Sequence, residues 1–265
     1  MRHITLLTDF GETEGEHAVL KGVIWNILPG ASIADLSHVV EPQNIHQAAL
    51  ILERVCHYFP PETIHIVVVD PGVGTARRPI AARFGSQFFV GPDNGVCTPL
   101  LMRARQNGEP VEIVHLDKPE YWLPDVTAIF HGRDIFAPSG AHLAAGVPLV
   151  ELGTPIEDVV LYQSQEPILE DGRITGQVIH IDHFGNILTN IPRKMLEPLR
   201  PVAVMIGSTT IHGMVNTFGE KPVGELVALY SPHYQLMIAV VNGNAAAKLE
   251  PAVGDKVVVY GRSST

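Results

Sequence analysis

Three short segments of the sequence place a carboxylate beside glycine at the end of an apolar run. They are residues 7–11 with the sequence LTDFG, residues 69–78 with VDPGVGTARR, and residues 181–186 with IDHFGN. Glycine lets the main chain turn sharply or approach a ligand closely. Each segment is therefore a candidate part of a binding or catalytic site. The alternative is that each is only a strand-to-loop turn whose aspartate accepts hydrogen bonds from local backbone amides.

Asp70 and Arg77 form a more specific candidate pair. A seven-residue loop can bring the guanidinium back to the carboxylate, although a surface ion pair explains the same spacing. Arg78 is adjacent and could be the arginine that matters instead. His131 follows apolar residues and precedes a predicted helix, so its ring could reach the same cleft or serve only as a structural histidine. These residues alone do not identify a reaction.

Cysteine and histidine patterns do not predict a metal or redox centre. Cys56 and Cys97 stand in unrelated contexts without a CxxC pair, which is typical of buried structural thiols. The thirteen histidines include no HExxH pattern, and the closest pairs, His38 with His46 and His180 with His183, lack supporting ligands. We expect no bound metal.

The charge and hydropathy of the chain limit its partners and location. A formal charge of −10, from 28 acidic and 18 basic residues, argues against a nucleic-acid surface and tolerates a cationic small molecule. The apolar runs are shorter than the roughly 20 residues of a membrane-spanning helix. The N-terminus lacks the features of a signal peptide. We expect a cytoplasmic protein without membrane contact.

The first part of the chain alternates apolar strand-like runs with helix-like stretches. Strands are expected at 3–7, 32–36, 63–69, 87–90 and 112–116, and helices at 15–28, 45–58, 96–106 and 132–145. This order predicts an α/β domain with a largely parallel sheet and helices on both faces. Ligands in such sheets bind beyond the carboxyl ends of strands, where Asp9 and Asp70 are expected.

Beyond residue 150 the pattern changes to short apolar runs separated by turns. These runs cover residues 174–181, 201–206, 226–230, 235–241 and 257–260. Their spacing predicts a small all-β, barrel-like domain. We therefore divide the chain into an N-terminal domain, residues 1–165, and a C-terminal domain, residues 166–265.

Taken together, the motifs resemble the S-adenosylmethionine hydroxide adenosyltransferase family, which uses water and is related to fluorinases and chlorinases. The resemblance covers almost the whole chain. Its motifs are LTDFG with the following Lys21-Gly22, VVVDPGVGTARR, GPDNG at 91–95, FHGRDIFAPSGAHLAAG at 130–146, IDHFGNILTNI at 181–191 and GNAA at 243–246. The resemblance implies an α/β domain followed by a β-barrel, no cofactor, and a homotrimer with ligand sites between subunits.

The resemblance also assigns residues to the sugar and methionine parts of the substrate. Asp9 corresponds to the carboxylate on the ribose hydroxyls, where it can accept two hydrogen bonds from a vicinal diol. Asp182 falls where the family holds the methionine amino group. Ser231 corresponds to a residue at the methionine carboxylate, although residues 231–235 form a stretch one residue longer than its counterpart.

Five further positions are implied to hold adenine. Phe184 and Asn186 match positions of the adenine pocket, and Phe218 matches the same face. Asn244 and Ala245 fall on the segment whose backbone reads the adenine edge.

The nucleophile is indicated by departures from the halogenating relatives. Those relatives have a tyrosine at the position of Asp70, a threonine at Val73 and a serine at Gly132. A carboxylate repels a halide and hydrogen-bonds to water instead. The family's water-activating trio corresponds to Asp70, Arg77 and His131. The resemblance thus implies hydrolysis to adenosine and methionine by in-line attack of water at the ribose C5′ carbon.

Three other functions stay open at the level of sequence. One is halide-dependent displacement on the same substrate. Another is a non-catalytic sensor of adenosine or S-adenosylmethionine. The third is a metal-dependent hydrolase that uses the histidines.

Overall fold

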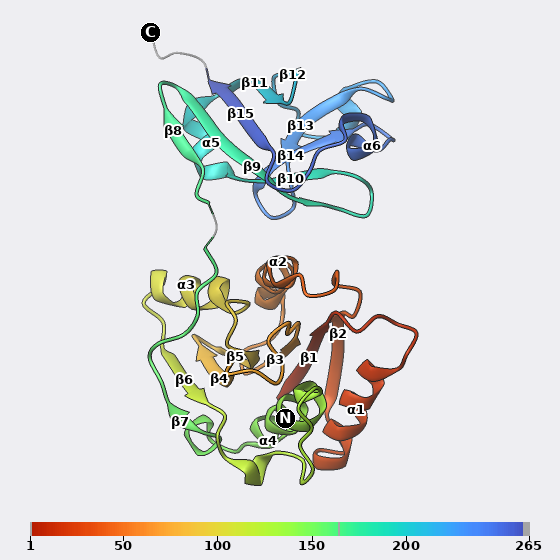
Figure 1. Ribbon diagram of the computed structural model, residues 1–265. Helices are drawn as coiled ribbons and strands as arrows, with labels where there is room; N and C mark the ends of the chain where they lie inside the picture. Colours follow the sequence, from red (N-terminus) through yellow and green to blue (C-terminus); the bar gives the residue numbers. More distant parts are fainter. Residues whose placement is uncertain (1, 164, 262–265) are drawn as a thin grey trace. The chain divides into compact units, whose positions relative to one another are not determined.

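The computed structural model describes residues 2–163 and 165–261 (Figure 1). Contacts within the chain define two compact units, residues 1–163 and 164–265. Each unit has its own sheet and hydrophobic core, and each is described by itself.

The N-terminal unit is built on a seven-stranded mixed sheet. Its strands are β1 (His3–Thr8), β2 (Ser32–Ser37), β3 (Ile64–Val68), β4 (Pro79–Phe84), β5 (Gln87–Pro92), β6 (Val111–His115) and β7 (Thr154–Pro155), in the spatial order β2-β1-β3-β5-β4-β6-β7. The four strands β2, β1, β3 and β5 run parallel, as the sequence predicts. The carboxyl ends of β1 and β3 therefore lie side by side at one edge, which places Asp9 and Asp70 near each other.

Four helices cover the two faces of this sheet: α1 (Glu16–Ile27), α2 (Ile45–Val55), α3 (Thr98–Gln106) and α4 (Ala137–Ala145). Figure 1 shows α1 and α4 on one face and α2 and α3 on the other. Side chains alternate between the faces along a strand. Ile4 and Leu6 of β1 accordingly pack with α1 and α4, whereas Leu7 packs with α2 and α3. The predicted α/β class is confirmed.

Strand β4 makes the sheet less parallel than the sequence suggests. It pairs antiparallel with β5 through a two-residue turn at Gly85-Ser86, where Gly85 has a φ of +62°. β6 and β7 continue the antiparallel pairing. The sequence PIAARF of β4 has few residues with strong strand propensity. Its strand state comes from pairing with a neighbour on each side.

The predicted helix over 132–145 has two parts. Residues Gly132–Phe136 form a π-helical turn, and α4 continues from Ala137. Gly146 ends α4 in the left-handed conformation, with φ of +107°. π-Helical turns occur frequently at functional sites, and this one begins directly after His131.

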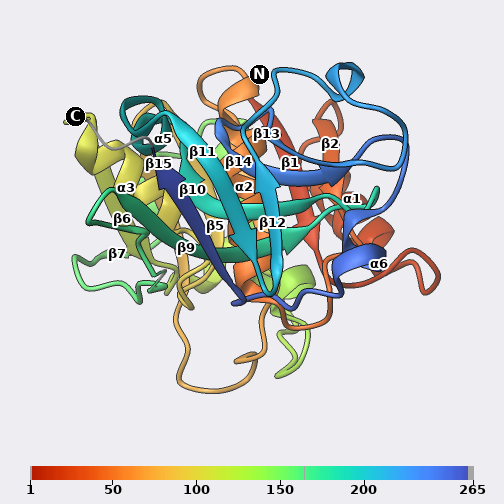
Figure 2. The ribbon, with the colours of Figure 1, turned by 90° about the horizontal axis from the view of Figure 1, so that it is seen from above.

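The C-terminal unit is an eight-stranded antiparallel sheet that nearly closes into a barrel. Its strands are β8 (Ile168–Glu170), β9 (Arg173–Ile181), β10 (Ile187–Pro192), β11 (Pro201–Ile206), β12 (Thr209–His212), β13 (Leu226–Tyr230), β14 (Gln235–Val240) and β15 (Lys256–Gly261), with the short helices α5 (Arg193–Leu199) and α6 (Ala245–Leu249). The order is β12-β11-β15-β9-β10-β14-β13, with β8 added on β9. Figure 2 shows β12, β11 and β15 as neighbours. The predicted barrel-like class is confirmed.

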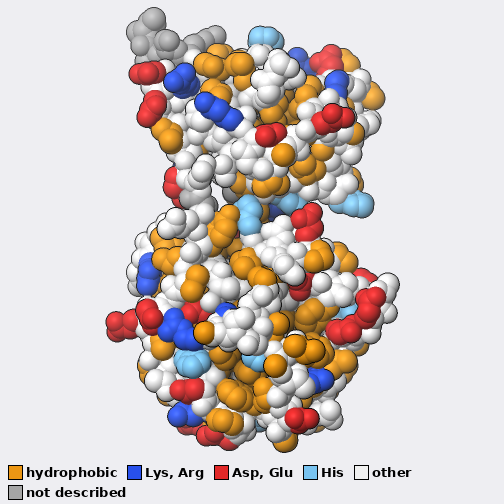
Figure 3. Space-filling model, in the orientation of Figure 1, with side chains coloured by type: hydrophobic (Ala, Val, Ile, Leu, Met, Phe, Trp, Pro, Cys, Tyr) orange, Lys and Arg blue, Asp and Glu red, His pale blue; other side chains and the backbone are white. Residues whose placement is uncertain are grey.

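Two properties of the molecule bear on its partners. No helix within the described ranges 2–163 and 165–261 is both long and apolar enough to cross a membrane. On the face shown in Figure 3, the described Lys and Arg side chains are scattered among acidic ones and form no continuous basic stripe.

Candidate active site

A cavity of about 270 Å³ lies where β1 and β3 of the N-terminal unit end. Asp9, Asp70 and His131, which come from three separate motifs, all line it. The remaining lining consists of Phe10, Gln43, Val68, Pro71, Val73, Ile129, Phe130 and Gly132. The fold therefore brings these three predicted site residues to one place.

Asp70, Arg77 and His131 are joined through the arginine. Arg77 Nε donates to Asp70 Oδ1 at 3.0 Å, and Arg77 Nη2 contacts Asp70 Oδ2 in the same two-pronged pair. Nη2 also lies 3.2 Å from His131 Nδ1. The Arg77 and Asp70 side chains are only 6% and 5% exposed. This ion pair is buried, which sets it apart from the surface pair that the sequence allowed.

Arg77 fixes the tautomer of His131. A guanidinium nitrogen can only donate, so Nδ1 of the histidine must accept and the ring proton must lie on Nε2. Partial burial and the nearby Arg77 charge lower the pKa of His131, outweighing the opposing effect of Asp70. The ring is therefore neutral at pH 7.

The loop from Asp70 to Arg77 is shaped by its glycines and by Thr75. Val73 N donates to Asp70 O at 3.2 Å, and Thr75 Oγ1 donates to Gly72 O at 2.7 Å. Gly74 has a φ of +75°, and a Cβ there would stand 2.5 Å from Ala128 O. Only glycine fits this point, because both the backbone conformation and the space exclude a side chain.

The adjacent Arg78 has different partners, which answers the question of which arginine faces Asp70. Arg78 Nε donates to Asp93 Oδ2 at 3.0 Å, and Nη1 donates to Asp158 Oδ1 at 3.0 Å. Next to Asp93, Asn94 Nδ2 donates to Val69 O at 2.9 Å, directly before Asp70. The GPDNG motif at 91–95 therefore holds both ends of the loop.

Asp9 lines the same cavity and is held by a main-chain amide. Gln43 N donates to Asp9 Oδ2 at 2.7 Å. Gln43 itself has a φ of +66°. No sequence pattern points to Gln43, because the contact uses a backbone N–H that any residue except proline offers.

Gly132 leaves no room for a larger residue in this wall. A Cβ at this position would stand 2.9 Å from Val68 Cγ1 and 3.4 Å from Phe10 Cζ. Val68 is β-branched and cannot turn aside easily. A serine here would therefore require the wall to move.

A larger cavity, of about 940 Å³, lies in the C-terminal unit. It contains six residues that the sequence assigned to substrate binding: Asp182, Phe184, Asn186, Phe218, Ser231 and Asn244. Further lining residues, not singled out from the sequence, include Asn216, Thr217, Tyr230, Met237 and Asn242. Ala245 is fully buried as the first residue of α6 and does not line the cavity with a side chain.

Several of these residues also organise their own loops. Asp182 Oδ1 accepts from the backbone N–H groups of Phe184 and Asn186, both at 2.9 Å, and Oδ2 accepts from Asn186 Nδ2 at 2.8 Å. This is the turn-forming role that the sequence offered as an alternative. Asn244 Oδ1 caps α6 by accepting from Ala247 N at 2.7 Å. Phe184, in contrast, is 73% exposed and free to contact a ligand.

An α/β unit and a barrel-like unit, each with a cavity lined by residues of glycine-rich turns, define a two-domain protein with two candidate cavities for a small molecule. Comparison with protein families gives the class. The SAM hydroxide adenosyltransferase N-terminal domain matches residues 4–153, and the C-terminal domain of the same family matches residues 176–258. The chain belongs to the SAM hydroxide adenosyltransferase family, as the sequence motifs predict.

Known proteins similar to this chain agree with this assignment. A Salinispora tropica protein named (R)-S-adenosyl-L-methionine hydrolase is 37% identical over 258 residues, 97% of each chain. A fluorinase from Nocardia brasiliensis is 28% identical over 223 residues, 74% of this chain and 73% of the relative. The solved structure of an uncharacterized conserved protein from Thermotoga maritima has a TM-score of 0.90 and 36% identity, covering 97% of this chain and 99% of that one.

Proposed function

We propose that the chain hydrolyses S-adenosylmethionine to adenosine and methionine, with Asp70, Arg77 and His131 as the catalytic residues. The observation that carries the proposal is the buried Arg77 between Asp70 and His131. Its Nη1 atom is buried and has no hydrogen-bond partner among the described residues. Arg77 does not itself line the cavity, but both of its partners, Asp70 and His131, do, so its charge lies directly behind the groups that would contact the attacking water.

The reaction needs a nucleophile more than it needs an acid. The sulfonium sulfur is already a good leaving group, because it departs as a neutral thioether. Water attacks C5′ in line with the C5′–S bond, a C–O bond forms, and the electrons of the C–S bond pass to sulfur. One proton leaves the attacking water. Holding the water at near-attack distance contributes several kcal/mol.

Asp70 is the proposed acceptor of that proton. The lone pair of neutral His131 lies on Nδ1, which accepts from Arg77 Nη2 at 3.2 Å. The carboxylate of Asp70 keeps further lone pairs beside its bonds to Arg77. In this assignment Arg77 stabilises the developing negative charge, and His131 keeps Arg77 in place.

In this proposal the residues of the two cavities bind different parts of the substrate. Asp9 accepts the ribose diol in the N-terminal cavity. In the C-terminal cavity, Asp182 and Ser231 hold the amino acid. The adenine ring is held by Phe184, Asn186, Phe218, Asn244 and the backbone at Ala245.

Two features favour water over a halide as the nucleophile. A buried carboxylate at position 70 repels an anion at short range. Gly132 offers no side-chain hydroxyl to a halide, and a Cβ at this position would stand 2.9 Å from Val68 Cγ1. The fluorinase relative nevertheless makes halide transfer the alternative to test.

The proposal includes a homotrimer, no cofactor and no metal, and action in the cytoplasm. A trimer whose sites lie between copies can be tested by mixing two inactive variants, Asp70→Asn and Phe184→Ala. Co-assembled chains regain activity if one site takes its halves from neighbouring copies. No recovery in a confirmed mixed oligomer contradicts that arrangement.

The central test is product analysis with purified protein. We expect adenosine and methionine in equal amounts from S-adenosylmethionine in halide-free buffer, and no change on addition of a chelator. Because the relatives are named for the (R) form, both sulfonium epimers are supplied separately. A 5′-halogenated adenosine formed only with halide supports halogenase activity instead. Intact substrate recovered after long incubation, despite measurable binding, supports a sensor.

A further inference from the structure

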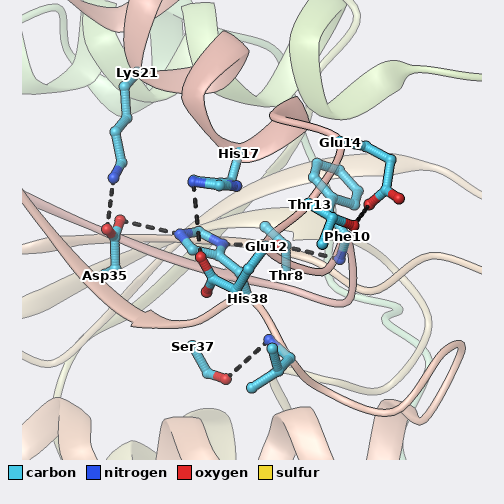
Figure 4. Close-up of polar contacts among 11 residues, drawn as sticks. Thr8, Phe10, Glu12, Thr13, Glu14, His17, Lys21, Asp35, Ser37 and His38 are labelled. Atoms are coloured by element: carbon cyan, nitrogen blue, oxygen red, sulfur yellow. Dashed lines mark hydrogen bonds and ion pairs between the residues drawn. The ribbon is translucent and has the colours of Figure 1, made fainter.

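Behind Asp9 lies a connected set of polar side chains that the proposed chemistry does not use. Figure 4 shows Lys21 reaching from α1 toward Asp35, with His38 and Thr8 beyond it. Lys21 Nζ donates to Asp35 Oδ2 at 2.5 Å, and His38 Nε2 lies 3.1 Å from Asp35 Oδ1. His38 Nδ1 is 2.9 Å from Thr8 Oγ1. Lys21, Asp35, His38 and Thr8 are called the Thr8 chain below.

The contact of His38 Nε2 with Asp35 is electrostatic, since Nε2 has no hydrogen-bond partner among the described residues, whereas the contacts of Lys21 with Asp35 and of Thr8 with His38 are hydrogen bonds. The carboxylate of Asp35 favours the His38 proton on Nε2, so Nδ1 accepts and the Thr8 hydroxyl donates to it. Thr8 Oγ1 is then free to accept from Phe10 N, which lies at 3.3 Å. Partial burial opposes ionisation of Asp35, but its contacts with Lys21 and His38 hold the pKa of Asp35 below its usual value. The Thr8 chain therefore ends on the amide that follows Asp9.

His38 holds the Asp9 loop from a second side as well. Its backbone carbonyl accepts from Gly11 N at 2.7 Å, and Gly11 has a φ of +76°. The His38 ring also stacks on His17, with centroids 4.5 Å apart. Thr8 is fully buried and His38 is 2% exposed, so water does not compete for these bonds.

An irregularity in β2 makes this arrangement possible. Leu6 and Leu7 of β1 pair with Asp35 and Ser37, which leaves Leu36 as one extra residue. Side chains three residues apart face opposite sides of a regular strand. The extra residue changes the phase, so that Asp35 and His38 both reach the side on which Thr8 lies.

We propose that the Thr8 chain positions Asp9 for the ribose hydroxyls, with Thr8 and His38 as positioning residues. The proposal rests on the proposed function, in which Asp9 accepts the diol. Phe10 N is held by Thr8 Oγ1 and Gly11 N by the His38 carbonyl. The Asp9 carboxylate between them is held by Gln43 N. A carboxylate already held in place loses less entropy when it takes up a ligand.

The same strand provides a matched control. Thr5 is also fully buried in β1, and its Oγ1 lies 2.8 Å from Nδ1 of the buried His65. The side chain of Thr5 points to the opposite face of the sheet from that of Thr8, and no described contact links it to the Asp9 loop. Thr5→Val and Thr8→Val thus remove the same hydroxyl from equivalent buried Thr–His pairs.

The test measures the affinity for adenosine and for 2′,3′-dideoxyadenosine by calorimetry. The ratio of the two affinities reports the diol contact, because the second ligand lacks both hydroxyls. We expect the wild type to prefer adenosine by about tenfold or more. Thr8→Val should lose most of this preference while its affinity for dideoxyadenosine stays the same. Thr8→Ser, which keeps the hydroxyl, and Thr5→Val should retain the preference.

The outcomes separate the two proposals. A wild type without preference for adenosine contradicts the role of Asp9 and with it the proposed function of this cavity. If the wild type shows the preference and folded Thr8→Val keeps it, the positioning role is wrong. Equal loss of both affinities in Thr8→Val also overturns it, since that result indicates general damage to the cavity. If Thr8→Val fails to fold, His38→Leu, which removes the acceptor for the Thr8 hydroxyl, takes its place in the same measurement with the same expected loss of preference.

Discussion

Asp70 has two roles in the proposed mechanism: it neutralises the charge of Arg77, and it accepts the proton of the attacking water. Asp70→Asn keeps the shape but removes the base. We expect kcat to fall about 10²–10⁴-fold, with little change in KM. Steady-state kinetics measures both constants. Asp117→Asn is the control, since Asp117 contacts Thr154 outside the cavity. A fall in affinity as large as the fall in kcat contradicts the assignment of Asp70 as base.

Protonation of His131 is expected to determine the pH below which turnover declines. Burial and Arg77 lower its pKa, so the neutral ring persists to a pH below its usual value near 6.5. Protonation of Nδ1 breaks the bond from Arg77. We expect turnover to stay constant from pH 8 down to about 6.5 and to decline only below that value.

The control for this pH profile is His131→Asn, whose amide oxygen can accept from Arg77 but does not titrate near neutral pH. Its acid limb should shift or disappear. An unchanged acid limb in that variant assigns the titration to another group.

At the scale of elements, the loop that carries Arg77 depends on a carboxylate outside the cavity. Asp93 has a side chain that is 2% exposed; it accepts from Arg78 and, at 2.8 Å, from Val160 N. Asp93→Ala leaves the Val160 amide without its partner and removes the buried one of the two carboxylates that pair with Arg78. We expect the free energy of unfolding in urea to fall by about 3 kcal/mol.

Asp158→Ala is the matched change, because Asp158 pairs with the same arginine but is 85% exposed. The free energy of unfolding of Asp158→Ala should fall by no more than about 1 kcal/mol. Equal losses for the two variants contradict the view that burial of Asp93 decides its contribution.

Sequence patterns predict the elements of this site better than its contacts. The ends of β1 and β3 follow from apolar runs, and so does the meeting of Asp9 with Asp70. Adjacent Arg77 and Arg78 have the same chemistry, and only the path of the loop decides which one faces Asp70. Gln43 acts through its backbone, so its residue type carries no information. Strand β4 depends on its neighbours rather than on its own propensity.

At the scale of the whole molecule, a buried histidine makes stability depend on pH. Burial lowers the pKa of His65 to about 4, whereas in the unfolded chain it stays near 6.5. Below pH 6.5 the unfolded chain binds a proton that the folded chain does not. The unfolding free energy should therefore fall by up to about 3 kcal/mol between pH 6.5 and 4.

Urea titrations at several pH values measure how steeply the unfolding free energy changes with pH. In His65→Asn, which retains an acceptor for Thr5, the dependence should be flatter over the same range. An equal slope in both proteins contradicts the role of His65, and carboxylates elsewhere then carry the effect.

The close packing at Gly132 also constrains the order in which this cavity could change during evolution. A serine introduced first meets Val68 Cγ1, since a Cβ would stand 2.9 Å away, and overpacking of this kind costs about 1–3 kcal/mol. A smaller residue at position 68 removes that obstacle, so the two substitutions are strongly epistatic. The stability cost of a hydroxyl-bearing side chain at position 132 therefore depends on whether Val68 has already been replaced by a smaller residue.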